Sequence, residues 1–154
     1  MNAYSVPTDF ANLYAWYKYD NLTQSGGAVS QVSDKSGNGR HAVQATVGNR
    51  PIYTASGGAS NKAYWTNTAA SAGGKYLLAG VASDWTFLHN GTGFTMFVVQ
   101  KNSTTDSYYI LGTQNGSGAN RGFGLVRLSS ASTRLAIGDG SLQIAGSDFT
   151  MTLS

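Results

Sequence analysis

The chain has 154 residues, a length at which one domain can bury roughly 68–70% of the surface that the unfolded chain would expose. It contains no cysteine, which excludes disulfides, thiol redox chemistry and thiolate metal sites. Only 11% of the residues are charged, and the ten lysines and arginines behind the net charge of +3 are scattered singly, so the footprint of a nucleic-acid-binding protein is missing.

The N-terminus has no basic cap followed by an apolar core, so we expect no secretory signal. No stretch approaches the roughly 18 apolar residues of a membrane span, and we expect no membrane insertion. Twenty glycines and few charges give the neutral, polar surface that is typical of secreted modules and virion shells. A virus particle assembled in the cytoplasm and released by lysis fits this combination, as does a protein whose signal has been removed.

The first elements lie around a polar segment. After an entry segment over residues 1–12, the aromatic, alternating run 13–19 predicts a half-buried strand. Residues 20–27 are expected to form a loop, and residues 28–32 again alternate apolar and polar side chains. The next segment, 32–42, is expected to form a rigid polar corner.

The corner is predicted from the side chains that alternate along it. Asp34, Ser36 and Asn38 can fold back onto backbone amides, and Gly37 and Gly39 can take the positive φ values that a tight reversal needs. We therefore expect a turn whose polar groups are satisfied by its own backbone.

The remaining chain predicts many short strands. Residues 41–47 fit either a strand or a helical turn, residues 52–54 continue extended, and Tyr64 and Trp65 form a short strand inside a long loop. Further strands are expected at 76–79, 94–100, 108–112, 122–128, 134–137, 142–145 and 149–153, with a hairpin turn at 138–141. Because no window shows a capped 3.6-residue apolar period, the predicted fold is all-β: an antiparallel β-sandwich with little helix.

The run 13–53, and above all the motif Asp-Lys-Ser-Gly-Asn-Gly that begins at Asp34, resembles the N-terminal half of LamG-like, concanavalin A-like jelly-roll domains. Among these domains, the run is most similar to those in bacteriophage virion proteins and bacterial surface proteins. Residues 94–99 and 122–125 resemble the central strands of that family. The resemblance implies one jelly-roll domain over residues 13–154, but no single activity, because the fold serves sugar binding, protein binding, catalysis and scaffolding.

Jelly-roll domains of this kind usually continue with further strands, whereas this chain ends directly after a strand-like run. A compact variant, a fragment and a sheet edge completed by a neighbouring chain all stay open. An open edge strand pairs readily with another subunit.

Catalysis is not expected. Glucanases of the superfamily need two Glu that flank an Asp on one strand, whereas all seven acids here are Asp and none lies that close to another. No Gly-x-Ser-x-Gly elbow occurs, and only His41 and His89 could act as a base. His41 lies near Asp34 and Ser36 in the sequence, but a histidine that is hydrogen-bonded within the turn is the favoured interpretation.

A calcium site is the alternative interpretation of the corner. Asp34, Ser36 and Asn38 stand at positions one, three and five, as in the opening of an oxygen-ligand calcium loop. The downstream bidentate acid is missing, and Lys35 and Arg40 would oppose a cation. The turn is therefore favoured, and we expect no cofactor, with calcium as the alternative.

Glycan binding would need exposed aromatic rings with amides or carboxylates close by. The candidate ligand-binding residues are Tyr64, Trp65, Trp85, Tyr108 and Tyr109, with Asn67, Asp84, Asn90 and Asn115 as polar neighbours. For each ring, packing of a loop over the sandwich is the competing interpretation. Trp16 is expected in the core.

Together, the residues and the resemblance predict a non-enzymatic structural and adhesive module in a phage particle: a head decoration, fibre or tail component. Its expected partners are other virion subunits, a second copy bound through an open sheet edge, and a cell-surface glycan. The alternative is a carbohydrate-binding module of a secreted or surface bacterial protein.

Overall fold

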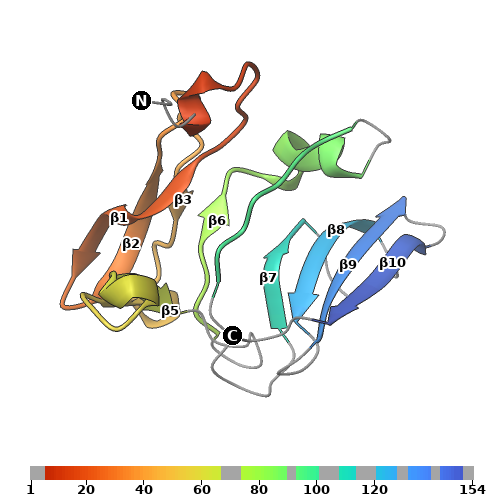
Figure 1. The fold of residues 1–154 in the computed structure, drawn as a ribbon. Helices are drawn as coiled ribbons and strands as arrows, with labels where there is room; N and C mark the ends of the chain where they lie inside the picture. Colours follow the sequence, from red (N-terminus) through yellow and green to blue (C-terminus); the bar gives the residue numbers. More distant parts are fainter. Residues whose placement is uncertain are drawn as a thin grey trace. The chain divides into compact units, whose positions relative to one another are not determined.

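The computed structural model describes residues 6–66, 74–89, 93–100, 108–113, 121–127, 132–139 and 143–150. Over these residues the chain is mostly strand, and its strands form two antiparallel sheets (Figure 1). The helices described are all of the 3-10 type: η1 (Pro7–Asp9), η2 (Val47–Asn49), η3 (Ala59–Asn61) and η4 (Ala82–Leu88). The all-β prediction is confirmed at this level. No helix in the described ranges is long and apolar enough to cross a membrane.

Two compact units divide the chain, Met1–Gly80 and Val81–Ser154, and each contains one of the sheets. The first sheet has six strands: β1 (Tyr17–Ser25), β2 (Ala28–Asp34), β3 (Ala42–Val43), β4 (Ile52–Thr54), β5 (Tyr64–Thr66) and β6 (Leu78–Ala79). Its order is β5-β4-β2-β3-β6, and β1 pairs with β2. Because β2 pairs with β1, β3 and β4, it is the central strand of this unit.

The first hairpin differs from the sequence prediction. The loop expected over residues 20–27 is wrong, because β1 continues to Ser25 and a two-residue turn joins it to β2. Gly26 and Gly27 both have positive φ values, 56° and 83°, as in the type I′ turns that suit the twist of paired strands. Residues 13–16, predicted as strand, form no regular element.

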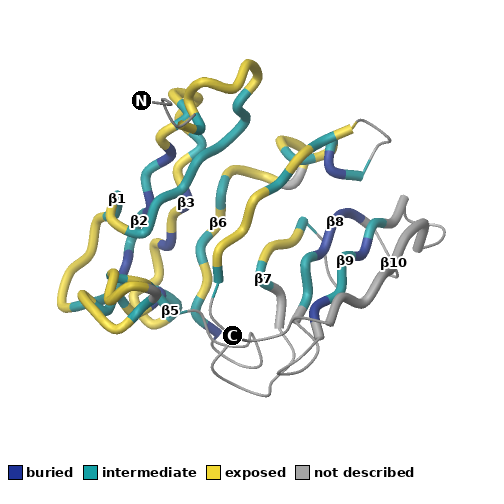
Figure 2. Tube along the Cα trace, viewed as in Figure 1, coloured by how far each residue is buried: buried dark blue, intermediate teal, exposed yellow. Residues whose placement is uncertain are grey.

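A bulge in β2 builds the core of the first unit. Val29 and Val32 are three residues apart and would point to opposite faces of a regular strand. Gln31 pairs with Thr23 and Val29 pairs with Gln24, which leaves one extra residue between them on β2. The bulge restores a common face, and both valines have 0% exposure and pack with Ala42. Figure 2 shows buried stretches in dark blue along β2.

The second unit is an antiparallel sheet of four consecutive strands in the order β10-β9-β8-β7. These are β7 (Tyr108–Gly112), β8 (Arg121–Arg127), β9 (Ser132–Asp139) and β10 (Gln143–Thr150). The bounds predicted for β7 are confirmed, and those of β8 are off by one residue. The two strands expected at 142–145 and 149–153 are wrong. One strand, β10, runs through Gly146 and Asp148, which pair with Ala136 and Arg134.

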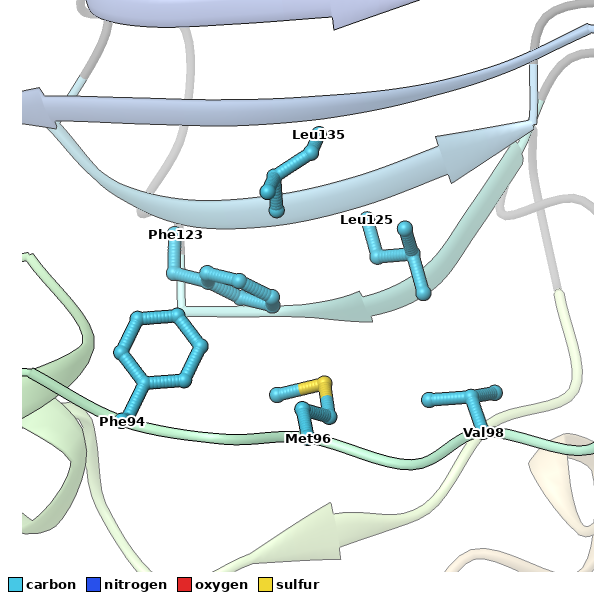
Figure 3. Close-up of a pocket in the computed structure, with 6 residues that line it drawn as sticks. All are labelled: Phe94, Met96, Val98, Phe123, Leu125 and Leu135. Carbon is cyan, nitrogen blue, oxygen red and sulfur yellow. The ribbon is translucent and has the colours of Figure 1, made fainter. Parts of the chain in front are cut away.

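Residues 94–100 show the predicted alternation, but the structure assigns them to no strand. Phe94, Met96 and Val98 point toward Phe123, Leu125 and Leu135 on the sheet, and the six side chains line an apolar cavity of about 320 Å³ (Figure 3). The intervening residues Phe97 and Val99 are 87% and 97% exposed. This segment therefore packs on one face of the sheet and leaves apolar side chains in solvent.

Two phenylalanines of the second unit provide a matched test of this packing. Phe123 is 1% exposed, and its ring meets the edge of the Phe94 ring at 5.7 Å between centroids. We expect Phe123→Ala to lower the free energy of unfolding by about 3–5 kcal/mol, the usual cost of removing a buried ring. Phe97→Ala should change it little. Denaturant unfolding measures both, and equal losses would contradict the packing.

Candidate functional site

The most highly organised polar cluster lies where β2 ends, and we call it the Asp34 corner: residues 13–17 together with residues 34–41. Residues 34–41 leave β2 and lead into β3, while residues 13–17 lead into β1. Tyr17 is paired with Asp34 in the ladder between β1 and β2. The corner therefore joins segments that are about twenty residues apart in the sequence.

The carboxylate of Asp34 is the centre of the corner. Its Oδ1 atom accepts hydrogen bonds from the backbone N–H groups of Trp16 and Ser36, each at 2.9 Å. Its Oδ2 atom accepts one from the Ser36 hydroxyl at 2.7 Å and one from the backbone N–H of Arg40 at 3.1 Å. Asp34 is only 8% exposed. Four donors therefore compensate a carboxylate that has little contact with water.

These contacts act in opposite directions on the pKa of Asp34. Burial of the carboxyl group is the largest single influence and raises the pKa. The hydrogen bonds from Trp16, Ser36 and Arg40 favour the ionised form, and together they outweigh burial, so the pKa lies below the usual aspartate value. Asp34 is therefore an anion at neutral pH and is not suited to act as a general acid there.

Asn38 fastens the entry of the chain to the corner. Its Nδ2 atom donates to the carbonyl oxygens of Leu13 at 2.7 Å and Tyr14 at 3.1 Å. It also lies 3.1 Å from Oγ of Ser36. One side-chain amide thus satisfies two backbone carbonyls of a segment that has no strand partner of its own there.

Arg40 and two tyrosines form the outer side of the corner. The guanidinium carbon of Arg40 lies 3.8 Å from the centre of the Tyr14 ring, and Nη1 donates to the Tyr14 carbonyl at 3.3 Å. The Tyr17 hydroxyl donates to the carbonyl oxygen of Arg40. Burial, helped by the charge of Asp34, raises the pKa of Tyr17 to about 12, so Tyr17 stays a neutral donor.

His41 has a structural contact. Its Nδ1 atom accepts a hydrogen bond from the backbone N–H of Asp34 at 3.1 Å, which requires an unprotonated Nδ1. The hydroxyl of Ser36 is hydrogen-bonded to Asp34, not to His41. This arrangement is a histidine satisfied within a turn, and it does not supply the nucleophile–base pair of a serine hydrolase.

The structure brings the three calcium candidates, Asp34, Ser36 and Asn38, together as their spacing predicts. Both carboxylate oxygens of Asp34 already hold N–H and O–H donors, and the nitrogen of the Asn38 amide faces Ser36. Within the described ranges, no group of three His, Cys, Asp or Glu side chains could hold a metal ion. Calcium binding stays a prediction, and the geometry favours the turn over it.

The aromatic candidates for glycan binding do not share one setting. Tyr64 and Trp65 are neighbours on β5, but Trp65 packs against the core of the first unit while Tyr64 is 39% exposed. Trp85 lies on η4, with its ring 6.3 Å from that of Phe87. The side chains of Tyr108 and Tyr109 lie outside what the structure describes, as do Asn67, Asn90 and Asn115.

Sequence reasoning found the centre of the corner and missed its partners. The Asx-type pattern identified Asp34 and Asn38, whereas Tyr14 and Tyr17 gave no local signal for their contacts with Arg40. Trp16, expected in the core, is half-buried, and Lys35 Nζ lies 5.9 Å from the centre of its ring. The contacts that were missed span more than twenty residues and depend on the turn of the whole hairpin.

Comparisons of the chain with protein-family models, with curated proteins and with solved structures give no match. The resemblance to jelly-roll domains therefore depends on the residues named for it above.

The lowered pKa of Asp34 predicts how stability depends on pH. The contribution of this group is present above the unfolded pKa of about 4 and is lost as the pH falls through the lower folded value. We expect Asp34→Asn to cost about 2–3 kcal/mol at pH 7, since several bonds to a charged acceptor are weakened or lost. The difference from the unmodified chain should shrink below about pH 4.

The matched control is Asp20→Asn. Asp20 is exposed, and the ion pair that it forms among the described residues is with Lys18, at 3.2 Å, so its replacement should change stability little at any pH. Denaturant unfolding at several pH values measures both variants. An Asp34→Asn penalty that is the same at pH 3 and pH 7 would show that the ionised carboxylate does not stabilise the corner.

Proposed function

We propose that the protein is a non-enzymatic structural and adhesive module of a virus particle, a phage head decoration, fibre or tail component. The observation that carries the proposal is the Asp34 corner. Its carboxylate, hydroxyl, amide and imidazole groups all bind other parts of the same chain. The side chains that could take part in a reaction are thus used to hold the fold, as expected of a scaffold protein.

The absence of a catalytic arrangement at the corner follows from the same contacts. A general acid needs a raised pKa, and that of Asp34 is lowered. A histidine base needs an unprotonated ring nitrogen that faces its nucleophile. Nδ1 of His41 accepts from a backbone N–H, which leaves the proton of the neutral ring on Nε2, and the Ser36 hydroxyl is bonded to Asp34. These facts support the non-enzymatic part of the proposal.

The surface supports a role in assembly. Few charges and many small polar residues suit a shell protein that contacts neighbours over much of its surface. The four-stranded sheet ends at β7 and β10, and an edge strand offers unpaired backbone groups to another chain. We propose other virion subunits or a second copy as the partner, and a completed jelly-roll sandwich as the assembled fold.

Purified phage particles test this proposal. Antibodies against the chain, or mass spectrometry of particles separated on a density gradient, should detect it at a fixed ratio to the major capsid or tail protein. Deletion of its coding sequence should leave particles with a missing projection or with lowered adsorption to cells. A chain found only in the soluble fraction of the lysate, with normal particles after deletion, contradicts a virion role.

The alternative, a carbohydrate-binding module, is favoured by one side chain. Tyr64 is 39% exposed and lies beside the backbone of Gly57 and Gly58, so one part of its ring is supported and another is open. An exposed, supported aromatic ring is the usual platform for a sugar face. Trp65 on the same strand belongs to the core and cannot serve as the partner ring without disturbing it.

A glycan array with the unmodified chain and two variants separates the proposals. If sugar binding is the primary task, Tyr64→Ala should abolish the signal, because truncation removes the stacking surface. Tyr76→Ala, which removes a ring of similar exposure, is the control and should leave it unchanged. A clean array contradicts the carbohydrate module, and a signal that survives Tyr64→Ala excludes Tyr64 as the platform.

A further inference from the structure

The side chain of Asn38 occupies a position that requires a hydrogen-bond donor. Three acceptors converge on its Nδ2 atom: the carbonyl oxygens of Leu13 and Tyr14, at 2.7 and 3.1 Å, and Oγ of Ser36, at 3.1 Å. The Ser36 hydroxyl lies 2.7 Å from Oδ2 of Asp34, and with its proton directed there it presents lone pairs to Asn38. An ionised carboxylate has acceptors only, so it could replace none of these contacts.

The residue after Asn38 is a glycine that leaves the backbone nitrogen unhindered. Gly39 has a φ of 72°, in the left-handed region that glycine tolerates, and no atom lies within 4 Å of the place where a Cβ would be. Asn38 itself is exposed. Water therefore has access to the peptide unit between the two residues.

This sequence and setting allow a spontaneous covalent reaction. The backbone nitrogen of Gly39 attacks Cγ of Asn38, a C–N bond forms, the Cγ–Nδ2 bond breaks, and ammonia leaves with the proton from the Gly39 nitrogen. Water then adds to either carbonyl of the resulting succinimide and opens the ring to aspartate or isoaspartate. The net change is the replacement of a neutral amide by a carboxylate, with water as the only co-reactant.

We propose that Asn38 is a deamidation site and that its conversion loosens the Asp34 corner at residues 13 and 14. The product carboxylate faces the carbonyls of Leu13 and Tyr14 and lies near the charge of Asp34, with Ser36 between them. Acceptor–acceptor and like-charge repulsion both expel it. The carbonyls of Leu13 and Tyr14 then lose the amide donor of Asn38, while Trp16 keeps its bonds to Asp34 and Lys35.

The first experiment follows the reaction in the full chain. The folded protein is incubated at mildly alkaline pH beside the same chain in urea, and peptide mapping by mass spectrometry locates the conversion of Asn38. We expect conversion in the folded protein, with isoaspartate among the products. If Asn38 converts in urea but stays unchanged in the folded protein over the same period, the fold protects it and the proposal is overturned.

The second experiment measures the structural consequence by limited proteolysis. Chymotrypsin should cleave after Leu13 or Tyr14 about tenfold faster in the deamidated species and in the Asn38→Asp variant, since the donor that holds these two carbonyls is lost. Asn61→Asp is the matched control, because Oδ1 of Asn61 accepts from Gly57 N–H and a carboxylate keeps that bond. An unchanged rate of cleavage at these two residues after conversion would overturn the proposal.

Discussion

The first unit depends on one buried, ionised carboxylate. Asp34 can stay charged with so little exposure only while donors from separate places in the chain surround it, and those donors are supplied by Trp16, Ser36 and Arg40. The carboxylate in turn holds each of these donors in place. The end of β2, the entry to β1 and the approach to β3 are thereby fixed by a single side chain.

The sequence predicted what local chemistry determines. The Asx-type pattern located the corner, and aromatic and apolar runs between Gly, Ser and Asn turns located β7 and most of β8. The failures of the sequence prediction have physical causes. Residues 13–16 are held by contacts with residues eighteen or more positions away. Residues 94–100 alternate but have no ladder, because a ladder depends on distant partners. The Gly26–Gly27 turn had a local signal, which a loop interpretation of the polar residues before it obscured.

The site predictions likewise separate into what the local sequence indicates and what only the geometry shows. The corner was predicted as a turn, with calcium as the alternative, and the directions of the hydrogen bonds favour the turn. Spacing alone does not give these directions. The aromatic candidates could be ranked only by exposure: Trp65 packs on the core and Tyr64 is partly open. A fold whose polar groups face its own backbone, with few surface charges, is suited to persistent contact with neighbours, and this is the basis of the proposed virion role.

The central claim is that the Asp34 carboxylate holds the corner in its ionised form. The most direct test is an NMR titration that follows the carboxyl carbon of Asp34 in the folded chain together with the amide proton of Trp16. The account predicts a midpoint below the ordinary aspartate value of about 3.9, with the Trp16 amide losing protection in the same pH range. A midpoint at or above that value, or a Trp16 amide that does not respond, would contradict it.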